Sequence, residues 1–219
     1  MPRVLFEKKG RSVWISHLDL MRLFQRAFKR AGLPLKHTQG FNPRPSVSIA
    51  LPLSVGVEST CELLDFDLED FPVTCEEICE KLNGVLVDGV RVLRAYENGR
   101  KIRDLALLDC TVTMVYDKPT EQDTVREIQE LFAGSDLKVT KKTKNGPVEQ
   151  DILPMVKRVS VAAEGENTVV IRALICCQNP SLNPALLVSA VERYLPHRKP
   201  DQALIARNEV YDNNETIFR

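Results

Sequence analysis

The pattern of apolar and polar positions divides the first half of the chain into strands and amphipathic helices. Alternation predicts extended segments at residues 3–7 and 13–15, as one interrupted strand or a small hairpin, and strands at 47–51, 61–68 and 85–96. Helical periodicity predicts helices at 16–31 and 75–83. The resulting order is strand, helix, strand, strand, helix, strand. This is the βαββαβ order of a ferredoxin-like domain.

The second half of the chain repeats this order. Strands are predicted at residues 108–115, 137–161, 168–176 and 203–210, with helices at 120–133 and 183–195. The 137–161 stretch is interpreted as paired strands with a turn at Asn145-Gly146 and an irregular middle. Residues 212–219 are expected to be loose. The predicted fold class is therefore α+β, with two tandem ferredoxin-like (βαββαβ) domains at residues 1–100 and 101–219.

The helix at 16–31 carries strong local signals. Ser16 is a favourable N-cap, Asp19 closes a capping box, and Gly32 is typical of a helix end. At about 100° per residue its apolar positions form one face, which should pack on a sheet. The opposite face holds four cations and one acid: Arg22, Arg26, Lys29, Arg30 and Asp19. Because a solvated face usually mixes both signs, this face is a candidate contact for an anionic partner.

Charge is unevenly distributed, although the chain holds 30 basic and 30 acidic residues. Residues 1–50 contain ten Lys or Arg and two acids, a net charge of +8. Residues 51–80 contain nine acids and no Lys or Arg, a net charge of −9. Such polarity favours nucleic acid at the basic part and a basic protein at the acidic part.

The segment 36–46 follows the helix and is rich in Gly, Pro, Asn and Arg. It displays an aromatic ring, cations, amides and a histidine: Lys36, His37, Gln39, Phe41, Asn42 and Arg44. Stacking combined with cationic contact is what recognition of single-stranded RNA requires. The same segment is also consistent with a rigid connector, because Pro43 and Pro45 hold the residues before them extended.

The opening part of the chain resembles a known family. A strand, then SHLDLMRLFQRAFKRAGLP, then QGFNPRPS, then a strand beginning SIALPL and running into GVES, is similar to the radical-SAM-linked (radical-SAM-associated) family of unknown function. The resemblance is specific over about residues 3–70 and looser beyond. Modules of that family occur alone or attached to B12-type radical SAM enzymes. The resemblance implies a bacterial, cytoplasmic accessory module with a radical SAM partner, and it carries over no catalytic residues.

Catalytic and metal-binding patterns are weak or missing. Ser16, His17 and Asp19 look like parts of a hydrolase triad, but a triad is assembled from distant segments, and helix capping explains the same residues. Cys75 and Cys79 have helical spacing without a matching ligand pair, so they are expected in the core and no metal is predicted. Phosphate-binding glycine motifs and the CxxxCxxC of a radical SAM cluster do not occur in the sequence, and no cofactor is predicted.

Cysteine spacing and the length of apolar runs bear on where the protein is located in the cell. The six cysteines lack the spacing of a disulfide framework, which indicates reduced thiols and a cytoplasmic protein. No apolar run approaches the about 20 residues of a membrane span, so no membrane partner is predicted.

Together these features favour a binding module over an enzyme. The leading hypothesis is an RNA-binding accessory protein, for tRNA or ribosomal RNA, that assists RNA modification by a radical SAM enzyme. Its contact residues are Arg22, Arg26, Lys29, Arg30, Lys36, Phe41, Asn42 and Arg44. An adaptor that docks the enzyme through residues 58–80 or 37–46 stays open. A metal-independent RNA endonuclease also stays open, with His17 and His37 as weak catalytic candidates.

Overall fold

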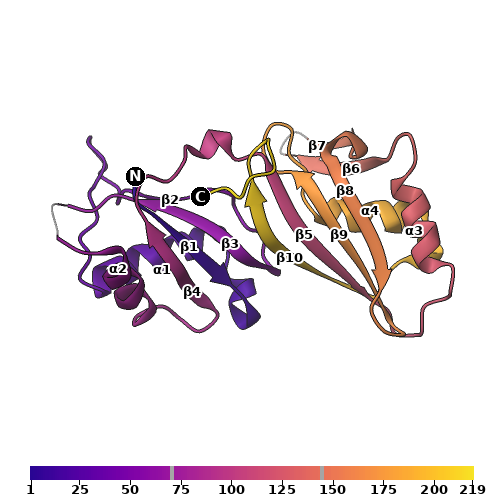
Figure 1. Cartoon of the computed structure of the whole chain (residues 1–219), viewed down its shortest axis with the longest axis horizontal. Helices are drawn as coiled ribbons and strands as arrows, with labels where there is room; N and C mark the ends of the chain where they lie inside the picture. The colour runs from indigo at the N-terminus through magenta and orange to yellow at the C-terminus, as the bar shows by residue number, and fades with distance from the viewer. Residues whose placement is uncertain (70–71, 144–145) are drawn as a thin grey trace. The chain divides into compact units, whose positions relative to one another are not determined.

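The computed structural model of the chain describes residues 1–69, 72–143 and 146–219, without the side chains of residues 142 and 143. The fold is α+β and forms two compact units (Figure 1). The first unit comprises Met1–Ile102 together with Arg219, and the second comprises Arg103–Phe218. None of the helices in the described part of the chain is long and apolar enough to cross a membrane.

The first unit has the predicted order of elements. These are β1 (Arg3–Lys8), α1 (His17–Arg30), β2 (Val47–Ile49), β3 (Val57–Phe66), α2 (Cys75–Asn83) and β4 (Val90–Tyr96). The strands pair antiparallel in the order β4-β1-β3-β2. Figure 1 shows α1 and α2 on one face of this sheet. The loop between α1 and β2 therefore emerges at the β2 edge of the sheet.

The core of the first unit lies between the sheet and the two helices. The predicted apolar face of α1 supplies buried Leu20, Phe24, Ala27 and Phe28, with Met21, Leu23 and Ala31 partly buried beside them. The Phe6 and Phe24 rings meet edge to face at 4.7 Å between centroids, and Phe28 contacts Phe66 at 5.0 Å. Cys75 and Cys79 pack against this core as predicted and are partly buried.

The helix caps match the sequence signals closely but not completely. The Ser16 hydroxyl accepts a hydrogen bond from the Asp19 backbone N–H at 3.2 Å. The Asp19 carboxylate, however, accepts from the Ser16 hydroxyl rather than from its backbone, so the predicted reciprocal box is incomplete. The box at α2 is complete, with Thr74 and Glu77 bonding each other's backbone N–H.

Two predicted strand segments of the first unit are wrong. Residues 13–15 were expected to be extended, but Gly10–Trp14 form a short 3-10 helix, in which Ser12 N–H donates to the Lys9 carbonyl. Residues 85–89 were expected in β4, but Val85 and Leu86 N–H groups still donate to the Leu82 carbonyl at the end of α2. In both places local i to i+3 or i+4 hydrogen bonds replace the pairing that alternation predicts.

The second unit has the same sheet order with an added hairpin. Its elements are β5 (Leu107–Val115), α3 (Thr124–Phe132), β6 (Lys138–Thr143), β7 (Gly146–Asp151), β8 (Val156–Ala163), β9 (Thr168–Cys176), α4 (Ala185–Tyr194) and β10 (Gln202–Tyr211). Within the unit the main strands follow the order β10-β5-β9-β8, and β6 and β7 form a separate two-stranded sheet. The predicted turn falls partly outside the described residues, because Asn145 is not described.

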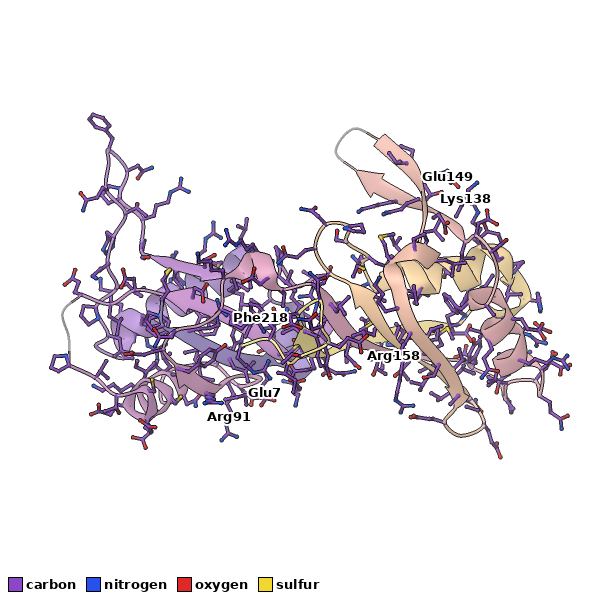
Figure 2. The ribbon with its side chains drawn as sticks, turned by 45° about the horizontal axis from the view of Figure 1, so that its top comes forward. Glu7, Arg91, Lys138, Glu149, Arg158 and Phe218 are labelled. Carbon is purple, nitrogen blue, oxygen red and sulfur yellow. The ribbon has the colours of Figure 1, made fainter. Side chains whose placement is uncertain are left out.

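An irregular segment within residues 137–161 separates the β6–β7 hairpin from β8. A 3-10 turn at Leu153–Met155 lies between β7 and β8, so the β6–β7 hairpin closes on itself and β8 joins β9 instead. Figure 2 shows the hairpin, with Lys138 and Glu149 labelled, standing apart from the main strands of its unit.

Two further expectations for the second unit are wrong. The helix expected at 120–133 begins only at Thr124, and the Thr120 hydroxyl donates to the Glu166 carbonyl instead. Residues 212–219 were expected to be loose, but the Phe218 side chain, labelled in Figure 2, is fully buried. The backbone N–H of Phe218 donates to the Val210 carbonyl. The Asp212 carboxylate accepts hydrogen bonds from the backbone N–H groups of Asn214 and Thr216, which stabilise the turn that leads from β10 back to Phe218.

Candidate nucleic-acid interface

The cationic face of α1 points to solvent. Arg22, Arg26, Lys29 and Arg30 are all exposed, because burial of the apolar face on the sheet turns the opposite face outward. With a rise of 1.5 Å per residue, the four cations extend over about 12 Å of helix. We refer to these four residues as the cationic stripe.

A single acid lies beside the cationic stripe. The Asp19 carboxylate accepts a hydrogen bond from Arg22 Nη1 at 2.9 Å. Hydrogen bonds from the Ser16 hydroxyl and from Arg22 lower the pKa of Asp19, so this carboxylate is charged at neutral pH. Among the described residues, no carboxylate lies within ion-pair distance of Arg26, Lys29 or Arg30. Three of the four cations are thus available to an external anion.

The 36–46 loop is a narrow ribbon with a defined base. The backbone N–H of Lys36 donates to the Asp67 carbonyl at 2.9 Å, and Ser46 N–H donates to the Lys36 carbonyl at 2.7 Å. Further out, Thr38 and Arg44 exchange two hydrogen bonds, from Thr38 N–H to the Arg44 carbonyl and from Arg44 N–H to the Thr38 hydroxyl. The segment between α1 and β2 extends away from its unit in Figure 2. These hydrogen bonds hold the base of the loop together, and its tip is presented to solvent.

The tip of the ribbon carries the predicted aromatic. Gly40 has φ +126°, a left-handed conformation that a side chain rarely adopts, and it reverses the chain there. Phe41 follows it with a relative exposure of 112%, which means that its ring contacts nothing else in the protein. Asn42 and Arg44 are also exposed, and Lys36 Nζ lies 3.4 Å from Asp67 Oδ1. Both faces of the ring are therefore open to a planar group that approaches the tip of the loop.

His17 and His37 do not share a site. His17 is the first residue of α1 and His37 lies beyond its last, and a helix of 14 residues is about 21 Å long. The loop that holds His37 is anchored to Asp67, next to the start of β1, whereas His17 lies near the end of β1. A general acid and base must both reach the reacting group within hydrogen-bond distance. The pair therefore cannot act together on one phosphodiester.

The second unit contains a charged cluster that the sequence did not indicate. Arg198 is 8% exposed and binds Glu127 through Nε and Nη2, at 3.0 and 3.1 Å, and Glu121 through Nη1 at 2.6 Å. Hydrogen bonds from Arg198, and from His197 at 2.8 Å, lower the pKa of Glu127 to about 2. The cluster borders a cavity of about 370 Å³. Its charged groups already bind one another, which accounts for it as a stabilising network.

Cysteine chemistry is not prominent. Burial raises the pKa of the Cys75 and Cys79 thiols, which disfavours the reactive thiolate. Burial also raises the pKa of Cys110 and of Cys177 to about 12. Within the ranges that the structure describes, no three His, Cys, Asp or Glu side chains are grouped so that they could hold a metal ion.

Comparison with solved structures finds a chain of similar fold. A chain of a Cbf5-Nop10-Gar1 complex superimposes with a TM-score of 0.53 at 9% identity, and the match covers 95% of this chain and 48% of that chain. Chains of an H/ACA RNP bound to a substrate RNA containing 2'-deoxyuridine and of the archaeal box H/ACA sRNP Nop10-Cbf5 complex both give a TM-score of 0.49 at 8% identity. These cover 96% and 94% of this chain, and 46% of each solved chain. This chain thus spans about half the length of the solved chains it matches, and at such identity the likeness concerns the fold alone.

Sequence comparisons place the chain in a family without a characterised activity. No curated protein matches it. A family model described as "Uncharacterized protein conserved in bacteria (DUF2344)" matches residues 2–184, which is most of the chain. The chain therefore belongs to this family of uncharacterized proteins conserved in bacteria.

Proposed function

We propose that this protein is an RNA-binding module that contacts RNA through the cationic stripe and the 36–46 loop. The observation that carries the proposal is the pairing of three unneutralised cations on one helix face with a fully exposed Phe41 on the adjoining loop. Cations on one face bind phosphates and an exposed ring stacks on a base, and single-stranded RNA offers both groups. Phosphate contacts supply affinity, and contacts to bases from Phe41 and Asn42 supply the preference for RNA with accessible bases.

The finer features belong to the same proposal. The strand orders β4-β1-β3-β2 and β10-β5-β9-β8 support two tandem ferredoxin-like domains, with a hairpin added to the second. We place their boundary near residue 100, as the two compact units support. The resemblance to radical-SAM-linked modules supports an accessory role in modification of tRNA or ribosomal RNA beside a radical SAM enzyme.

The adaptor alternative is less well supported. Much of the acidic 58–80 segment is already engaged, because Asp65 binds Arg3 at 2.5 Å, Asp67 binds Lys36, and Glu62 is 3% exposed. A docking surface made of these acids would have to give up intramolecular partners. The endonuclease alternative no longer has a candidate pair of catalytic residues, because His17 and His37 lie at opposite ends of α1.

The test measures the binding of labelled tRNA and of a labelled ribosomal RNA fragment by fluorescence anisotropy across a series of salt concentrations. The double variant Arg26→Gln/Arg30→Gln, at two cations without an acidic partner, should bind more weakly, and the slope of log affinity against log salt should be shallower by about 1.4, since each phosphate contact contributes about 0.7. The matched control is Arg126→Gln/Lys157→Gln, which removes the same charge from exposed positions of the second unit. Equal affinity and slope in the two double variants would show that α1 is not the RNA face. Binding of a protein partner that survives nuclease treatment, without RNA binding, would favour the adaptor.

A further inference from the structure

Trp14 is a large aromatic side chain that the folded unit leaves in water. Its relative exposure is 72%, although its neighbours Ser12 and Val13 are buried. Tryptophan buries more apolar area than any other residue when it joins a core. Its position outside the core is therefore a feature that folding alone does not explain.

The backbone around Trp14 is held firmly. The fully buried Lys8 donates from Nζ to the carbonyls of Val13 and Ile15, the residues on either side, at 3.2 and 3.0 Å. Gly56 N–H donates to the Val13 carbonyl at 2.9 Å, and the Trp14 ring lies close to the Gly56 backbone. The Trp14 ring thus lies against the Gly56 backbone, on a segment whose backbone is held by these hydrogen bonds. Such support lowers the ordering cost when a planar ligand stacks on the ring.

The cationic stripe continues toward Trp14 through an exposed leucine. Leu18 is one turn before Arg22 on the same face of α1 and is 67% exposed. Val55 is 52% exposed on the loop before β3, directly before Gly56, which the Trp14 ring approaches. The first unit therefore exposes apolar side chains near the start of α1, cations along α1, and Phe41 on the loop that follows it.

Resting on the proposed RNA-binding function, we propose that the ligand is single-stranded RNA that runs along α1, with one base stacked on Trp14 and another on Phe41. Trp14 lies three residues before the first residue of α1, and the loop begins six residues after its last. The helix alone is about 21 Å long and Phe41 lies at the tip of the loop beyond its end, so at about 3.4 Å per stacked nucleotide the strand needs at least about six nucleotides to reach from one ring to the other.

This arrangement selects against a duplex. Bases within a duplex already stack on each other, and an aromatic side chain reaches them only by breaking that stack. A single strand has free base faces and a flexible backbone that can follow the cations. The surface should therefore prefer single strands longer than a threshold length, with little dependence on base sequence.

Trp14 provides its own probe, because it is the single tryptophan of the chain. Single-stranded RNA should quench Trp14 fluorescence, and in a length series from about four to twelve nucleotides the affinity should rise steeply only at lengths above about six. Trp14→Leu keeps an apolar side chain without an aromatic face and should weaken binding about fivefold to a hundredfold. Trp14→Phe keeps an aromatic face and should retain most of the affinity. Circular dichroism of both variants checks that the exposed position leaves the fold intact.

The possible outcomes separate this inference from the proposed function. RNA binding by anisotropy without Trp14 quenching, or with full affinity in Trp14→Leu, would overturn the stacking inference and leave RNA binding by the cationic stripe in place. Equal affinity for a duplex of the same length would overturn the single-strand preference. No binding of any RNA at low salt would refute the proposed function itself. Phe41→Leu should behave as Trp14→Leu does, since both rings are predicted to stack on bases.

Discussion

Asp19→Asn should strengthen RNA binding, which makes it a sharper test than any loss of function. Asp19 is the acid beside the cationic stripe, and it binds Arg22 at 2.9 Å. Asparagine keeps the size of the side chain and an oxygen that accepts from Ser16, so the start of α1 should be preserved. The substitution removes one negative charge from the surface and releases Arg22 to bind a phosphate.

The size of the effect follows from counterion release. One additional phosphate contact steepens the salt slope of single-strand binding by about 0.7. Across a tenfold change in salt concentration, the ratio of variant to wild-type affinity should therefore change about fivefold, with the larger gain at low salt. Near 1 M salt, where the screening length falls to about 3 Å, the two proteins should bind alike.

The chain offers a closely matched control. Asp123 stands at the start of α3 and binds Arg126 at 3.0 Å with the same i, i+3 spacing and similar exposure as the Asp19–Arg22 pair. Asp123→Asn changes the net charge of the protein by the same amount, but on the second unit. Anisotropy titrations of both variants over a salt series give the comparison. If both variants gain equally, net charge governs binding, and if Asp19→Asn gains nothing, the cationic stripe does not bind RNA.

Other predictions concern stability. Phe24→Ala should lower the free energy of unfolding by about 3–5 kcal/mol in urea titrations, because the ring is fully buried and packs against Phe6; a cost below about 1 kcal/mol would contradict this packing. The stabilisation by Glu127, whose pKa is lowered from 4.5 to about 2, is complete above about pH 4.5 and lost as the pH falls toward 2. The difference in urea midpoint between wild type and Glu127→Gln should therefore shrink over that range, and a constant difference would refute the ion pair. Thr74→Ala should cost about 0.5–2 kcal/mol by removing the α2 cap, and an unchanged midpoint would argue against it.

Much of the local structure is predictable from the sequence. The faces of α1 follow from the 3.6-residue repeat, and the capping residues at 16 and 74 act on backbone groups within three residues of themselves. The exposed state of the cationic stripe follows too, because burying the apolar face leaves the opposite face in water. The candidate residues of the 36–46 loop were likewise visible as a cluster of types that contact RNA.

The placement of the histidines and the exposure of Trp14 required the tertiary structure. The sequence shows His17 and His37 flanking one helix, but only the three-dimensional course of the chain shows that this helix holds them at opposite ends. Alternation placed Trp14 in a strand, where a face would have been buried. The 3-10 helix and the contacts of Lys8 turned its ring outward instead.

By itself, the sequence determined the identity, order and caps of most elements, because these depend on hydrogen bonds and side-chain periodicity within a few residues. Tertiary structure alone decided which strands pair and which loops stand out. Arg3 meets Asp65, 62 positions later, and β8 pairs with β9 while β6 and β7 close on each other. Strand pairing depends on the burial and hydrogen bonding of segments far apart in the chain, and a pattern within a few residues does not contain that information.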